Sequence, residues 1–226
     1  MTRCGVVLCG AMMIAAGCNS DDKGNGMITG GDSLASYTVT FTATWSAATH
    51  PVDYPSNPHF SALVGATHDT SVVFWANDEL ATAGIQDMAE RGRTSPLSEE
   101  VDTAIIDGTA RFKLIGDGIG ISPGSVSLEI TVSAEHPLIT LVSMIAPSPD
   151  WFVGVAGLPL HDGESWADSV TVDLYGWDAG TDDGITYASA NVPSNPHIPI
   201  YPLIDGMFKV GDVVPPLGTF TFVRRP

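Results

Sequence analysis

Three aspartates fall within six residues of one short segment, WDAGTDDG at residues 177–184. Asp178, Asp182 and Asp183 follow a run that alternates like a β-strand, and Gly180 lies among them. Carboxylates held in a tight turn repel one another, since two of them ~4 Å apart cost roughly 4 kcal/mol at an effective dielectric constant near 20. The segment is therefore either a solvated surface loop or a site for a cation, and its own sequence leaves both readings open.

A second acidic position occurs earlier, in PSPDWFVGV at residues 147–155, where Asp150 lies between a double-proline turn and an apolar run. A β-sandwich gathers its loops at two ends, so that Asp150 can meet the segment 177–184. A hard cation relieves the repulsion of converging carboxylates, and calcium takes about six to eight oxygen ligands, including backbone carbonyls and water. Gly180 lets the backbone bend so that the aspartates on either side of it face one point. These residues predict a calcium site that is not an EF-hand, because the EF-hand glycine and the flanking helices are missing.

Composition argues against several other functions. The net charge of −17 makes nucleic acid an unexpected partner, because phosphate binding needs a basic surface. None of the six histidines has a zinc-protease spacing such as HExxH. A pair of carboxylates for glycoside hydrolysis stays open as an alternative.

The first 18 residues have the composition of a secretory signal. MTRCGVVLCGAMMIAAGC contains one basic residue, Arg3, then an apolar run too short to span a bilayer, then small residues before Cys18. The ending AAGC resembles a bacterial lipobox, with Ala15 where leucine is usual, which predicts lipidation of Cys18. An ordinary cleaved signal or an uncleaved anchor is the alternative. Polar, glycine-rich residues 19–36 are expected to form a flexible tether.

This processing would leave a domain at residues 37–226 without cysteine, since Cys4 and Cys9 depart with the signal and Cys18 carries lipid. No disulfide and no cysteine-ligated zinc is then expected. Asn19, rather than aspartate, follows the lipidated cysteine, which in a Gram-negative host favours the outer membrane.

Alternation with a period of two is the clearest structural signal in residues 37–226. It predicts strands in SYTVTFTATW, SVSLEITVS, SVTVDLYGW and TFTFV, and the more continuously apolar LITLVSMI predicts a central strand. Two segments, GIQDMAERG and SPLSEEVDTAIID, predict short connecting helices, the second with Pro96 at its first position and Glu99 and Glu100 in its first turn. We expect an all-β fold, a single antiparallel sandwich.

Together, PSPDWFVGV and WDAGTDDG resemble the paired motif of the spondin N-terminal domain family. Further segments fall in the family's order, so that the resemblance covers Tyr37 to Ile204: YTVTFTATWSAATHP, HFSALVGATHD, VVFWANDELATAGIQDMAERG and GITYASANVPSNPHIPI. The resemblance implies a C2-like antiparallel β-sandwich of about eight strands with one calcium site on its loops. Its ligand aspartates correspond to Asp150, Asp178 and Asp182, whereas Asp183 stands where the family often has a small polar residue. The animal proteins use disulfides, which this chain is not expected to form.

The combined expectation is a calcium-binding, non-enzymatic protein that is lipid-anchored in the cell envelope, at the outer membrane. It would act as a binding or adhesion module for a protein or glycan at the cell surface. The alternative is a calcium-supported envelope glycan hydrolase. Calcium-mediated docking to anionic lipid is a third hypothesis. We expect no such binding, because few acidic residues cluster here and no basic segment flanks them. The lipid anchor is therefore the only expected membrane contact.

Overall fold

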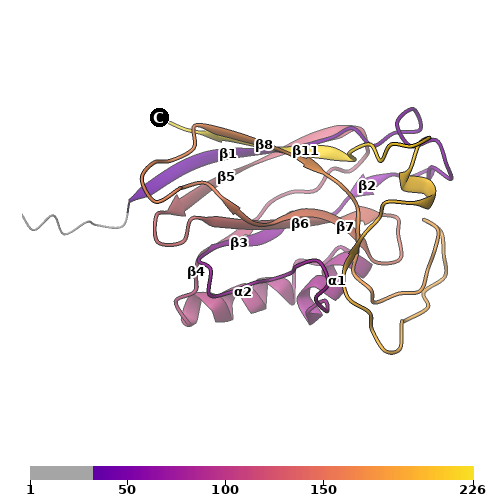
Figure 1. Cartoon of the computed structure of the whole chain (residues 1–226), viewed down its shortest axis with the longest axis horizontal. Coiled ribbons are helices and arrows are strands. Elements are labelled where there is room, and N and C mark those ends of the chain that lie inside the picture. The colour runs from indigo at the N-terminus through magenta and orange to yellow at the C-terminus, as the bar shows by residue number, and fades with distance from the viewer. Residues whose placement is uncertain (1–32) are drawn as a thin grey trace, which may run out of the picture. The chain divides into compact units, whose positions relative to one another are not determined.

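The computed structural model describes residues 33–226. The predicted signal peptide (1–18), with Cys18, and residues 19–32 of the predicted tether lie outside the described residues. Within residues 33–226, two antiparallel sheets pack face to face and two helices cover the outer face of one of them (Figure 1). This confirms the predicted all-β sandwich, in which eight of the described strands have five or more residues.

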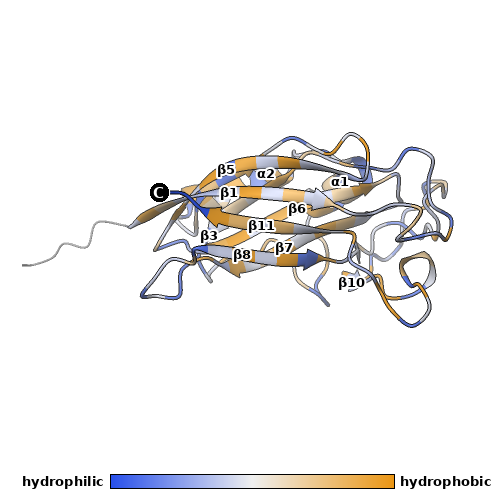
Figure 2. Cartoon of the chain, turned by 90° about the horizontal axis from the view of Figure 1, so that it is seen from above, coloured by the Kyte–Doolittle hydropathy of each residue, from blue (hydrophilic) through white to orange (hydrophobic). Residues whose placement is uncertain are grey.

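The first sheet has four strands. Their order is β5 (Gly124–Ser133), β1 (Leu34–Ala43), β11 (Gly218–Arg224) and β8 (Ser169–Leu174). Alternate side chains of β1, such as Tyr37, Val39 and Phe41, are fully buried, as the period-two pattern predicts. Figure 2 shows hydrophobic and hydrophilic residues alternating along the strands of this sheet.

β1 begins at Leu34, three residues before the predicted start of the domain. Leu34 pairs with Ser133 of β5, and Ala35 points into the core with 6% of its surface exposed. The segment Leu34 to Ser36 therefore belongs to the sandwich and not to the tether, because its backbone groups are used in the ladder with β5.

The second sheet has seven strands. Six follow the order β10 (Tyr201–Pro202), β9 (Trp177–Asp178), β7 (Trp151–Pro159), β6 (Leu138–Ala146), β3 (Val64–His68) and β4 (Ala110–Ile115), while β2 (His59–Phe60) also pairs with β6. β6 is the predicted central strand. Ile139 and Leu141 lie in the core between the sheets, whereas Val142 and Met144 lie in a second core beneath the helices. Burial on both faces explains why this strand is almost continuously apolar.

The two predicted helices form the third layer. They are α1 (Ala83–Arg91) and α2 (Leu97–Ile106), and a short 3-10 helix, η1 (Gly206–Phe208), precedes β11. Pro96 immediately precedes α2 and does not form its first turn. The carboxylate of Glu100 accepts hydrogen bonds from Thr82 Oγ1 at 2.8 Å and Gly84 N at 2.7 Å, so that an acid of α2 holds the N-terminus of α1.

Strand register places the two acidic segments at one end of the sandwich. Ala43 pairs with Gly218 and Gly218 with Leu174, so that β8 ends where β1 ends. The chain then crosses to the second sheet, where Asp178 pairs with Trp151 at the start of β7. The first residue of β1 lies at the opposite end of the sandwich (Figure 1).

Candidate metal centre

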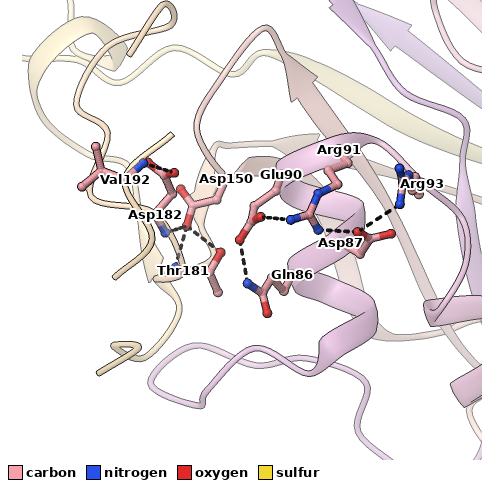
Figure 3. Close-up of polar contacts among 9 residues, drawn as sticks. All are labelled: Gln86, Asp87, Glu90, Arg91, Arg93, Asp150, Thr181, Asp182 and Val192. Atoms are coloured by element: carbon pink, nitrogen blue, oxygen red, sulfur yellow. Dashed lines mark hydrogen bonds and ion pairs between the residues drawn. The ribbon is translucent and has the colours of Figure 1, made fainter. Parts of the chain in front are cut away.

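Asp150 lies in the turn between β6 and β7 and is fully buried. Its Oδ2 accepts three hydrogen bonds from the second acidic segment: from Thr181 N at 2.7 Å, from Thr181 Oγ1 at 3.2 Å and from Asp182 N at 3.1 Å (Figure 3). The reverse contact is made by Ala179 N, which donates to the backbone oxygen of Asp150 at 3.1 Å. The two segments therefore meet, as the sandwich topology predicts.

The other carboxylate oxygen of Asp150, Oδ1, is buried and has no hydrogen-bond partner. A buried polar atom without a partner costs about 1–3 kcal/mol, and more when it carries charge. Buried oxygens of this kind are rare in folded proteins and are commonly satisfied by water or an ion. Asp150 Oδ1 is thus an acceptor with unused capacity inside the loop end of the sandwich.

Asp178 occupies the two-residue strand β9 and is 4% exposed. Its Oδ1 accepts from Gly180 N at 2.8 Å, and its Oδ2 accepts from the indole Nε1 of Trp151 at 2.9 Å. Gly180 has φ +71°, and a Cβ atom there would lie 2.1 Å from the backbone oxygen of Ile198. The turn after Asp178 therefore requires glycine for both its conformation and its close contact.

Asp182 is 5% exposed, and its carboxylate is held within its own loop. Its Oδ1 accepts from Gly184 N at 2.7 Å. Its Oδ2 accepts from Val192 N at 2.8 Å (Figure 3). Each oxygen has one donor and retains a further lone pair. The neighbouring Asp183 is exposed, and its carboxylate accepts from Ser194 Oγ. The structure thus separates two buried acids of this segment from one surface acid.

The buried carboxylates influence one another electrostatically. Burial, and after it the charge of Asp178, raise the pKa of Asp150 to about 7, against the hydrogen bonds from Thr181 and Asp182, which lower it. Burial also raises the pKa of Asp178, against the hydrogen bonds from Gly180, Tyr201 and Trp151, and the charge of Asp182 adds a smaller rise. A cation near these oxygens would favour their charged forms.

The donor chemistry fits a hard cation. Asp150, Asp178 and Asp182 offer only oxygen atoms, as calcium prefers. Among residues 33–226, no three carboxylate, imidazole or thiol side chains are gathered closely enough to hold a metal ion by themselves. Asp150 and Asp178 are the interacting pair, and the carboxylate of Asp182 is engaged by its own loop. Backbone carbonyls and water would have to complete the ligand set.

Sequence reasoning missed several donors that shape this site. Thr181 and the backbone of Asp182 hold Asp150, while Trp151 holds Asp178. Backbone N–H groups leave no trace in the residue types. The pairing of β7 with β9 was the missing information, since it sets Trp151 opposite Asp178.

Comparison with known proteins identifies the family of this domain. The profile of the Spondin_N family, the spondin N-terminal domain, matches residues 35–208. The chain belongs to this family. This spondin domain is 32% identical to human Spondin-2 over an alignment of 235 residues. The alignment covers 97% of this chain and 70% of the relative.

Two further relatives show how much of each protein the similarity covers. Spondin-2 of Rattus norvegicus is 34% identical over 206 residues, covering 84% of this chain and 62% of the relative. Spondin-1 of the same species is 36% identical over 175 residues, covering 75% of this chain and 22% of the relative. The spondin domain described here therefore spans a small part of Spondin-1. Within residues 33–226, no helix combines the length and the apolar composition needed to cross a bilayer.

Proposed function

We propose that this spondin domain is a calcium-dependent binding or adhesion module of the cell envelope. Asp150, Asp178 and Asp182, together with backbone carbonyls and water, would hold one calcium ion, which would place positive charge beside these buried acids. The unpartnered, buried Oδ1 of Asp150 is the observation that carries the proposal. The three aspartates would fix the two acidic segments relative to each other, so that the loop surface has one shape.

The ligand surface would be the loop end itself. Exposed apolar side chains are frequent in residues 185–204, which surround the aspartates, and exposed apolar patches often mark binding surfaces. Between 40% and 80% of the surface of these side chains is exposed: Ile185, Val192, Ile198, Tyr201 and Ile204. A protein or glycan at the cell surface is the proposed ligand class, because apolar contacts with a polar rim suit both.

Lipidation of Cys18 would attach the domain to the envelope, at the outer membrane. Supporting this, the chain enters the sandwich at Leu34, at the end opposite the aspartates, so that an anchor there leaves the loop end free (Figure 1). Incorporation of a labelled fatty acid in the native host tests this. Cys18→Ala should abolish labelling and release the protein, whereas Cys9→Ala should retain it. Equal labelling of both variants would contradict the anchor.

Thermal melting with calcium, magnesium and chelator tests the ion. A ligand at 100 times its Kd stabilises by about 2.7 kcal/mol, so saturating calcium should raise the Tm by roughly 5–10 °C for a domain of this size. Asp178→Asn should remove most of this rise. Asp173→Asn, an exposed position on β8, is the matched control and should keep it. A wild-type Tm that is the same in calcium and in chelator would refute the calcium site.

A further inference from the structure

Trp151 links the two acidic segments. It directly follows Asp150 in the chain and pairs with Asp178 across the β7–β9 ladder. Its indole Nε1 donates to Asp178 Oδ2 at 2.9 Å, and both residues are buried, at 2% and 4% exposure. One tryptophan therefore adjoins one proposed ligand through the backbone and holds another through its side chain.

The ring of Trp151 is itself fixed. It makes edge contacts with Tyr187 and Phe208, at ring-centre distances of 5.3 and 5.1 Å. Its backbone N donates to Ser148 Oγ at 3.1 Å within the turn that carries Asp150. The indole N–H thus has little freedom to leave Asp178 without moving the aromatic core.

Packing alone does not require this hydrogen bond. Trp75 is also buried, at 6% exposure, and stacks edge-on with Phe152 and Trp177, yet its Nε1 has no partner. A buried indole is accommodated there by shape alone. At Trp151 the donor is aimed at a carboxylate, which gains a charge-assisted hydrogen bond.

We propose that Trp151 is a positioning residue of the calcium site, acting through Asp178 without contacting the ion. The inference rests on the proposed function. Gly180 donates to one oxygen of Asp178 and Trp151 to the other, and the Tyr201 hydroxyl also hydrogen-bonds this carboxylate. The two oxygens still keep lone-pair capacity for a cation. Partners that orient metal ligands in this way typically contribute about 10–100-fold to metal affinity.

Trp151→Phe keeps the aromatic ring and removes the N–H, and Trp75→Phe is the matched control. Calcium affinity is measured by competition with a chromophoric chelator, and the Tm in chelator reports folding. We expect about 10-fold weaker calcium binding for Trp151→Phe, with the affinity of Trp75→Phe unchanged. Equal weakening in both variants, or wild-type affinity in Trp151→Phe, overturns the inference.

A second measurement needs no variant. With tryptophan indole nitrogens labelled for NMR, calcium should shift the Nε1–H resonance of Trp151 more than that of Trp75. A Trp151 resonance that stays in place while calcium binds overturns the positioning role and leaves the calcium site standing. Wild-type protein that binds no calcium refutes the proposed function instead, so the two failures are distinguishable.

Discussion

Two groups of acidic side chains, both drawn in Figure 3, are balanced in different ways. On α1, Arg91 contacts Asp87 at 2.5 Å and Glu90 at 3.1 Å, and Arg93 lies 3.9 Å from Asp87. The two arginine side chains are 49% and 68% exposed, so that they pair with acids while staying in water. These acids are balanced by full positive charges from the chain itself.

The acids of the loop end meet neutral donors instead. Asp150 is held by Thr181 and the backbone of Asp182, and Asp178 by Gly180 and Trp151. Hydrogen bonds of this kind favour the charged form of a carboxylate but leave its net charge in place. Burial and mutual repulsion prevail at Asp150, because its pKa is raised to about 7.

The difference follows from the space available. On α1 the long arginine side chains reach Asp87 and Glu90 from the solvent, although these two acid side chains are only 13% and 7% exposed. The guanidinium groups themselves lose little hydration, and ion pairs in contact with water are worth only about 0–1 kcal/mol. Between two sheets and their loops, a charged side chain would have to be buried, at a desolvation cost of several kcal/mol. A small cation from solvent can instead be enclosed by oxygens already present. The difference between α1 and the loop end therefore favours binding of an ion from solution at the loop end.

The largest expected effect comes from removing one buried charge. The folded-state pKa of Asp150, about 7, lies above its ordinary value. In metal-free protein its stabilising contribution is therefore complete below pH ~4 and lost as the pH rises through about 7, by about 1.4 kcal/mol per pKa unit. Asp150→Asn removes this titration. In chelator at pH 8 it should melt several degrees above wild type, while losing the 5–10 °C calcium response expected above.

Differential scanning calorimetry between pH 5 and pH 8, with chelator or calcium, measures both parts. Asp183→Asn is the control, because this exposed neighbour is outside the proposed ligand set. It should follow wild type in both conditions. A lower Tm of Asp150→Asn than of wild type in chelator at every pH would contradict this prediction. The carboxylate of Asp150 would then stabilise the fold through its hydrogen bonds alone.

Much of the scaffold could be predicted from side-chain types. Phe220 and Phe222 are fully buried, as the TFTFV pattern predicts, and Ile85, Met88 and Ala89 form the buried face of α1. These predictions succeed because burial of one face imposes a period on the sequence. The first three residues of β1, Leu34 to Ser36, were not predicted as part of the strand. They lie next to a polar, glycine-rich segment, where the alternation of apolar and polar residues is weak.

The acidic residues of the site could be predicted, but their contacts could not. Asp150 and Asp178 were recognisable by type and by family resemblance. β9 and β10 have two residues each, too few to show a period, and β9 sets Asp178 against Trp151. The long-range register, and with it the donors to each carboxylate, emerges only when the sheet is assembled. Calcium binding itself stays a prediction.

The smallest expected effect belongs to the paired acids of α1. Arg91→Ala should lower the Tm by only ~1–3 °C, because partly exposed ion pairs contribute about 0–1 kcal/mol. Salt at 0.5 M should shrink this difference by screening, while the response to calcium stays at the wild-type value. A smaller rise of the Tm in calcium for Arg91→Ala would show that the acids of α1 and those of the loop end interact, and would contradict their separation. If both results hold, this chain balances the acids of α1 with arginine and leaves the acids of its loop end to an ion from solution.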